Sequence, residues 1–218
     1  MTTRHAHRPT PKAAGFIPTA DERRINKAIN DVENSTSGEV VAVVTSESDS
    51  YLFAPILWAA LIALVVAWPL IYLTWMPVQW IYIVQIGIFA ALTLLLSLRP
   101  LRYALVPKSI KHERAHARAV EQFLVQNLHT TEGRTGVLIF VSVAERFAEI
   151  LADSAIHKAV PADTWQSIVD EMTAEIQQGR TADGFIRAIE TTGKLLAKHF
   201  PPGTGPDNIL TNHLIVLN

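Results

Sequence analysis

The stretch that decides the fold is a long run without any charged or histidine side chain, from Ser50 to Leu98. It contains two apolar segments, "LFAPILWAALIALVVAWPLIYLT" at residues 52–74 and "VQWIYIVQIGIFAALTLLLSL" at residues 78–98. Because a helix that crosses a bilayer needs about 20 apolar residues, the run predicts a transmembrane helical hairpin over residues 51–98. The alternative is a buried hairpin in a soluble protein, but two such segments are hard to cover in a small domain.

The composition of the whole chain agrees with membrane residence. Charged residues make up only 18 % of the 218 residues, which is low for a soluble domain. The formal net charge of −1 gives no reason to expect nucleic acid as a partner. The chain has no cysteine, which excludes disulfides and thiol chemistry. The lipid bilayer is therefore the first partner that the sequence predicts.

Basic residues predict the orientation of the hairpin. None lies in its turn, whereas six follow it closely: Arg99, Arg102, Lys108, Lys111, Arg114 and Arg118. Because Lys and Arg accumulate on the cytoplasmic side, the segment after the hairpin is expected there. An even number of spans then places both termini in the cytoplasm. Residues 1–18 lack the apolar core of a signal peptide and are expected to form a flexible arm.

One helix and one strand are predicted before the hairpin. Thr19 and Glu22 have the spacing of a capping box that opens a helix, and apolar residues follow at helical spacing: Ile25, Ala28, Ile29 and Val32. The β-branched run "EVVAVVT", Glu39 to Thr45, has the length and composition of a buried strand.

The segment after the hairpin predicts a further set of helices and strands. A helix at residues 111–128 carries an apolar stripe expected to face the core: Ala117, Val120, Phe123, Leu124 and Leu128. Two strands follow at residues 134–143 and 146–152, and then two helices at 163–178 and 181–199. The tail, residues 203–218, is irregular except for a short strand at 213–217.

The strand at residues 39–45 needs partners for its backbone groups, and the strands after the hairpin are the obvious ones. Charge independently places both soluble segments on one side of the membrane. Residues 19–50 and 99–202 are therefore expected to form one α/β domain, interrupted by the transmembrane hairpin.

Several short motifs in these elements resemble one known family. They are Ser37-Gly38-Glu39 at the first strand, Thr135-Gly136-Val137-Leu138 at the second, Gly179, and Asp183-Gly184-Phe185. With their surroundings they resemble the TPM domain, also called TPM phosphatase, over residues 19–47 and 112–201. The segments "HERAHARA" at 112–119 and "HFPP" at 199–202 are similar to a membrane-anchored bacterial branch, which implies the bacterial inner membrane as location.

The resemblance implies an α/β/α sandwich around a small mixed sheet. Members of the family have been described as weak acid phosphatases, as calcium binders and as accessory factors of membrane complexes. Two carboxylates, Asp153 and Asp163, lie near the family's acidic loop positions. Calcium prefers about six to eight oxygen ligands, so these two predict at most a weak site. The alternative interpretation is that both residues are helix caps and turn formers.

A second metal motif is His112-Glu113-x-x-His116, which on a helix places two histidines on one face beside a general base. Zinc catalysis also needs a third ligand. Glu149 and Asp153 have the E-x-x-x-D spacing that some zinc peptidases use, but Glu149 lies in the predicted strand at 146–152, whereas that ligand motif belongs on a helix. The cations around the motif instead favour a basic helix next to anionic headgroups.

The first functional hypothesis is an inner-membrane protein whose TPM-like domain serves membrane-protein complexes with little or no catalysis. One alternative is a weak metal-dependent phosphatase that uses Asp153 and Asp163, with calcium as the metal. The other is a zinc metallopeptidase at His112, Glu113 and His116.

Overall fold

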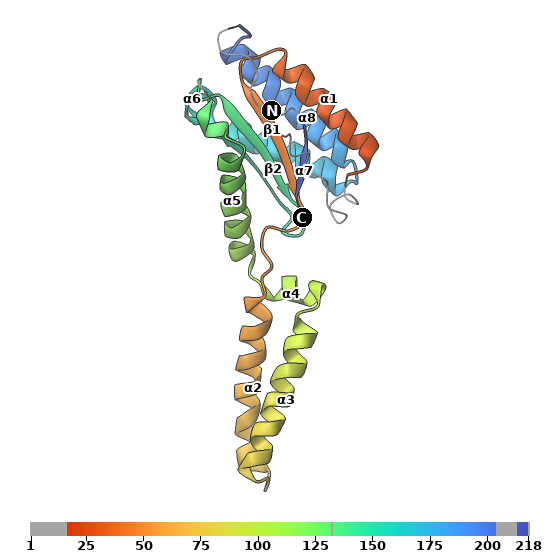
Figure 1. The fold of residues 1–218 in the computed structure, drawn as a ribbon, viewed down its shortest axis with the longest axis vertical. Coiled ribbons are helices and arrows are strands. Elements are labelled where there is room, and N and C mark those ends of the chain that lie inside the picture. Colours follow the sequence, from red (N-terminus) through yellow and green to blue (C-terminus); the bar gives the residue numbers. More distant parts are fainter. Residues whose placement is uncertain (1–16, 132, 204–212, 218) are drawn as a thin grey trace, which may run out of the picture. The chain divides into compact units, whose positions relative to one another are not determined.

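The computed structural model describes residues 17–131, 133–203 and 213–217 (Figure 1). The residues form two compact units. The sheet unit contains the described residues up to Ser48 together with those from Glu113 onward, and the hairpin unit contains Asp49–His112. Residues 1–16, which include most of the predicted N-terminal arm, lie outside the described part.

The sheet unit is built on a mixed sheet of four strands in the order β3-β2-β1-β4. β1 (Glu39–Thr45) is parallel to β2 (Gly136–Ser142) and to the short β4 (Ile215–Leu217). β3 (Phe147–Ala152) is antiparallel to β2. The strand that precedes the hairpin therefore pairs with strands that follow it, as predicted. β3 is not a direct partner of β1, because β2 lies between them.

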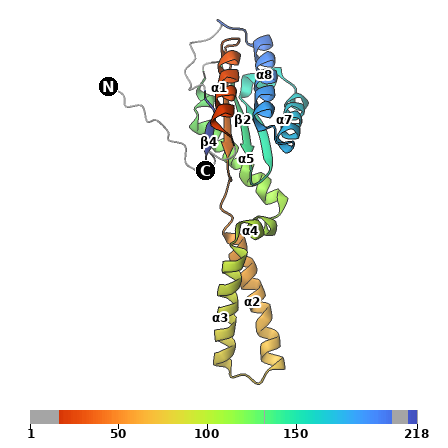
Figure 2. The same cartoon turned by 90° about the vertical axis from the view of Figure 1, so that its right-hand side faces the viewer.

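Helices cover both faces of the sheet, which confirms the predicted α/β class. One face carries α1 (Thr19–Glu33), α6 (Ser154–Ala159), α7 (Ala162–Gln177) and α8 (Thr181–His199). α7, α8 and α1 lie next to one another in Figure 2. Their buried side chains, such as Ile29, Met172 and Phe185, pack on Val40 and Ile139. The other face is covered by Ala119 of α5 (Lys108–Val125) and by the short 3-10 helix η1 (Leu128–Thr130).

Helix α1 buries the predicted residues Ile25, Ala28, Ile29 and Val32, but its predicted capping box is wrong. Thr19 is already helical, and the N-cap position is held by Pro18, whose φ is −59°. The backbone N–H groups of Asp21 and Glu22 donate to the Pro18 carbonyl oxygen. The proline therefore starts the helix one residue earlier than a threonine cap would.

Helix α5 is turned differently from the predicted orientation. Ala115, Ala119 and Gln122 are its buried residues, whereas Val120 and Leu124 of the predicted stripe are 38 % and 50 % exposed. Only Phe123 of the predicted stripe within α5 packs on the sheet, and Leu128 is buried in η1. Small residues on the inner face let the helix approach Leu138 and Phe140, whose bulk fills the space.

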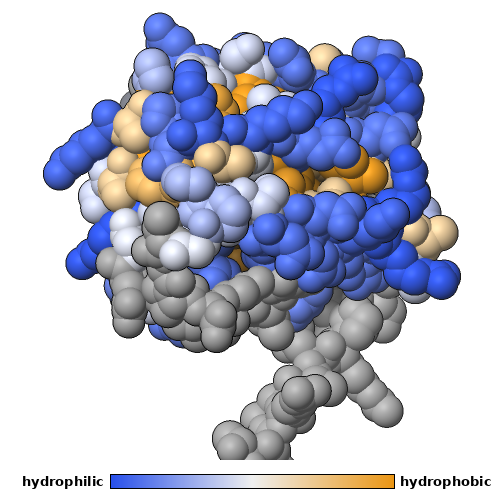
Figure 3. Space-filling view, turned by 90° about the horizontal axis from the view of Figure 1, so that it is seen from above, coloured by the Kyte–Doolittle hydropathy of each residue, from blue (hydrophilic) through white to orange (hydrophobic). Residues whose placement is uncertain are grey.

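The hairpin unit consists of α2 (Phe53–Leu73), α3 (Val78–Leu96) and the short α4 (Arg99–Leu105). α2 and α3 are long and apolar enough to cross a membrane. Few of their residues are buried, mainly small ones of α2 such as Ala54, Ala59 and Ala63. The visible face of the sheet unit, by contrast, is mostly hydrophilic with narrow apolar strips (Figure 3).

Candidate functional site

His112 and His116 lie on α5, one helical turn apart, as the motif predicted. The Nδ1 atom of His116 lies 2.8 Å from Oε2 and 3.0 Å from Oε1 of Glu149 on β3. This contact ties the histidine to the sheet. Within the part of the chain that the structure describes, no group of three His, Asp or Glu side chains is arranged to hold a metal ion. The geometry thus gives His116 a carboxylate neighbour and, among the described residues, no assembled zinc site.

Asp153 and Asp163 belong to two different helix starts. Asp153 is the N-cap of α6, and its Oδ1 accepts a hydrogen bond from the Ser154 backbone N–H at 2.5 Å. Its Oδ2 is buried and has no hydrogen-bond partner among the described residues, and the Arg134 guanidinium is 4.0 Å from Oδ1. Asp163 is exposed in the first turn of α7, where its charge favours the positive end of the helix.

The positions of Asp153 and Asp163 determine which oxygen ligands a cation could bind. Asp153 offers one free carboxylate oxygen, but the described carboxylates do not gather around it. Glu132, which precedes the loop of Arg134, lies outside the described residues. A calcium ion would want about six to eight oxygens, so the described side chains supply only a small part of such a site.

A buried hydrogen-bond network, which sequence reasoning missed, lies at the other end of the sheet. The Glu145 carboxylate, 5 % exposed, accepts hydrogen bonds from the Ser48 backbone N–H at 3.0 Å and from the Ser142 hydroxyl. The Ser48 hydroxyl donates to the Ser142 Oγ at 2.8 Å. The network fixes the chain where it leaves β1 for the hairpin. The sequence shows only a glutamate in a short turn, a type of residue that is usually exposed, so it gave no signal.

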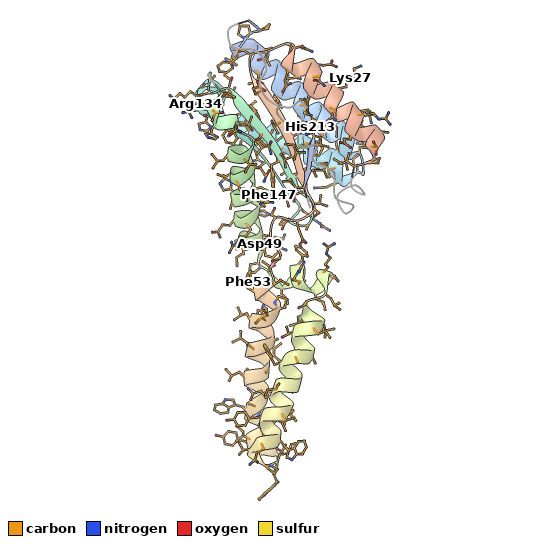
Figure 4. The ribbon with its side chains drawn as sticks, viewed as in Figure 1. Lys27, Asp49, Phe53, Arg134, Phe147 and His213 are labelled. Atoms are coloured by element: carbon orange, nitrogen blue, oxygen red, sulfur yellow. The ribbon has the colours of Figure 1, made fainter. Side chains whose placement is uncertain are left out.

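Next to this network lies a groove of about 540 Å³ between the ends of β2 and β3 and helix α7. Its lining is mainly apolar, with a few polar side chains: Val141, Ser142, Val143, Arg146, Phe147, Ala148, Thr173, Ile176 and Gln177. Phe147 and Arg134 mark opposite ends of the sheet (Figure 4). Ser142 is completely buried, so its hydroxyl is closed to a substrate.

The fold and these sites define a class: an α/β sandwich domain interrupted by an apolar helical hairpin, without a group of three His, Asp or Glu side chains placed to hold a metal ion among the described residues. Residues 101–195 match the family described as the TPM domain. Over these residues the chain is similar to the TPM domain, in agreement with the resemblance of its sequence motifs. β1 lies outside the matched residues, yet it is one of the two interior strands of the sheet, next to β2.

A solved structure shares the fold. It is the NMR structure of the BA42 protein from the psychrophilic bacterium Bizionia argentinensis, with a TM-score of 0.58 and 20 % sequence identity. The match covers 92 % of this chain and 95 % of that one. At this identity the likeness concerns the fold alone. No curated protein matches the sequence.

Proposed function

We propose that this chain is an integral membrane protein whose TPM domain is an interaction module for membrane-protein complexes, with little or no catalysis. The observation that carries the proposal is the outward orientation of large apolar side chains on both hairpin helices. Trp68 is 66 % exposed, Leu73 78 % and Leu94 75 %. Each large apolar side chain left in water forgoes about 1.5–3 kcal/mol, and a bilayer removes this cost for the whole surface.

The low burial of these helices also weighs against a soluble hairpin. A core helix has its apolar residues covered, whereas only 11 % and 6 % of the most apolar windows of α2 and α3 are buried. Lipid is the environment that fits such a surface.

The orientation proposed is a hairpin in the bacterial inner membrane with both soluble segments on the cytoplasmic side. Its support is the asymmetry of basic residues. Arg99 begins α4, three positions after the end of α3, and Lys108 begins α5, whereas the turn between α2 and α3 carries no charge.

The interaction role is supported by how the chemical groups are used. His116 is engaged by Glu149, Asp153 caps α6, and Asp163 lies in the first turn of α7. These arrangements support a structural use of the predicted metal ligands, so the phosphatase and peptidase hypotheses have less support.

Single introduced cysteines test the membrane topology, because the chain has no native cysteine. Met76→Cys places a thiol in the hairpin turn. Lys27→Cys places one in the segment before the hairpin, and Ser109→Cys places one in the segment after it. We expect a membrane-impermeant maleimide to label Met76→Cys in intact spheroplasts and the other two variants only after lysis. Labelling of Lys27→Cys in intact cells would overturn the orientation, and release of the protein by alkaline carbonate would overturn membrane integration.

Purification from membranes with the hairpin intact tests the interaction role. We expect a defined membrane protein to co-purify, and no turnover of a chromogenic phosphate or of casein with calcium or zinc. Phosphatase activity lost in Asp153→Asn would support the first alternative instead. Peptidase activity lost in Glu113→Gln would support the second.

A further inference from the structure

Strand β3 lies at one end of the sheet and pairs only with β2 among the described strands. The Asp153 backbone N–H donates to the Gly136 carbonyl oxygen at 2.9 Å. In an antiparallel ladder, alternate residues direct their N–H and C=O groups to opposite sides. Glu149 and Leu151 therefore face β2, and three residues direct their backbone groups away from it: Ala148, Ile150 and Ala152. Such a row is a template for the addition of another strand.

The groove beside β3 adds a pocket to this edge. Ala148 is one of the outward-facing residues and also lines the groove, together with the apolar side chains of Val141, Val143 and Ile176. Side chains of an added strand would alternate between the two faces of the sheet. One of them would therefore enter the groove next to Ala148, whose small side chain leaves room for it.

Arg146 gives the groove a charge. It occupies the last position of the turn between β2 and β3, with a φ of 51°, and its side chain is exposed. No carboxylate among the described residues lies within ion-pair distance of its guanidinium. A partner that carries a carboxylate at this end of the edge would supply the missing counter-charge.

A second copy of the chain fits this edge poorly. Pairing of two β3 strands is antiparallel, so it would direct the carboxyl ends of the two β1 strands in opposite directions. Each β1 is followed by α2 after only residues 46–52, a link that spans at most about 25 Å. Two hairpins in one bilayer would need both β1 strands to end towards that bilayer, whereas antiparallel pairing of the β3 strands directs one of them away from it.

We propose that the free edge of β3 binds an extended peptide segment with apolar residues at alternate positions and a carboxylate near Arg146. The inference rests on the proposed interaction function and names the class of partner. Backbone hydrogen bonds to Ala148, Ile150 and Ala152 hold the segment, the groove selects one side chain, and Arg146 selects the carboxylate.

Two measurements on the full-length protein in detergent micelles test the site. The first is hydrogen exchange, in which the amides of Ala148, Ile150 and Ala152 should exchange faster than those of Glu149 and Leu151. Equal protection of all five would mean that the edge is already covered, and would overturn the proposal.

The second measurement uses an array of synthetic octapeptides with varied sequences, each made with a free carboxyl terminus and as its amide. Retained peptides should have alternating apolar residues, and Ala148→Pro should weaken their binding by about tenfold or more, because it removes an outward donor and blocks strand addition. Ladder bonds survive this change, since an edge strand tolerates proline where its N–H faces outward. Ala148→Ser, which keeps the donor and the small size, is the matched control.

Arg146→Gln tests the carboxylate. It should weaken the retained peptides, and Arg146→Lys should restore part of the affinity. If amidation has the same effect as Arg146→Gln, the carboxylate is the peptide's terminus; if amidation has none, it is an Asp or Glu side chain. Retention of no peptide, or equal retention by Ala148→Pro, would overturn the site. A membrane protein that still co-purifies with Ala148→Pro would leave the interaction function standing and reject only this surface.

Discussion

At the scale of single residues, helix α8 approaches α1 closely at Gly193. A Cβ added there would meet the Val32 methyl carbons at 2.5 and 2.6 Å. Valine is stiff at χ1, so the backbones would have to separate. Gly193→Ala is expected to lower the free energy of unfolding by about 1–3 kcal/mol, measured by urea denaturation of the sheet unit.

The matched control is the double variant Gly193→Ala/Val32→Ala. Removal of the methyl groups makes room for the new Cβ, so the double variant should be more stable than the sum of the two single changes predicts, by about 0.5–3 kcal/mol. Additive effects would show that the contact with Val32 is not what requires a glycine.

Also at this scale, one ion pair at the junction of α7 and α8 predicts a pH effect. The Arg180 Nε donates to Glu175 Oε2 at 2.5 Å, and this hydrogen bond lowers the pKa of Glu175 against the opposing effect of desolvation. Because the pKa of Glu175 is lowered in the folded state, the ion pair stabilises the fold fully at pH values above the ordinary pKa of glutamate. This stabilisation is lost as the pH falls through the folded-state pKa. Arg180→Gln should raise the pKa of Glu175 towards its ordinary value and reduce the loss of stability in acid.

An NMR titration of the Glu175 side-chain carboxyl carbon measures this pKa. Arg187→Gln is the control, because the Arg187 guanidinium is farther away, at 3.4 Å from Glu175 Oε1, and its charge is a smaller cause of the shift. A pKa that stays low in Arg180→Gln would contradict the assignment.

At the scale of the element, α5 yields a prediction that separates its two faces. Ala119 is completely buried against the sheet, whereas Leu124 on the same helix is half exposed. Ala119→Leu should overpack the contact with Leu138 and Phe140 and destabilise the sheet unit by about 1–3 kcal/mol. Leu124→Gln should change the unfolding free energy by at most about 0.5 kcal/mol. A lower urea midpoint for Leu124→Gln than for Ala119→Leu would support the orientation of α5 that the sequence predicted.

Strand β1 and helix α5 differ in how far the sequence predicts their place in the fold. Strand β1 was predictable, because a β-branched run must find backbone partners, and the run at Gly136–Ser142 supplied them. The buried face of α5 was not, because apolar size alone marks Val120 and Leu124, whereas close packing on a sheet favours Ala115 and Ala119. The Glu145 network was equally hidden, since it joins residues nearly a hundred positions apart.

At the scale of the whole molecule, the sheet unit is a compact unit built from the segments before and after the hairpin. We therefore expect the sheet unit to fold when the hairpin is removed. We expect a chain in which a flexible Gly–Ser linker of about 20 residues replaces residues 50–107 to keep β1 paired with β2, because each doubling of loop length costs only about 0.6 kcal/mol. It should be soluble without detergent and monodisperse in size-exclusion chromatography, and it should show a cooperative urea transition.

Ala42→Asp in the shortened chain is the control for β1. Ala42 is completely buried opposite Ile139 in the interior strand, so an unpaired carboxylate there should abolish the transition. If the shortened chain aggregates while the full-length protein in micelles unfolds cooperatively, the hairpin contributes to the fold of the sheet unit. If Ala42→Asp leaves the shortened chain unchanged, β1 is not part of its folded core, and the pairing that joins the two halves of the sequence must be abandoned.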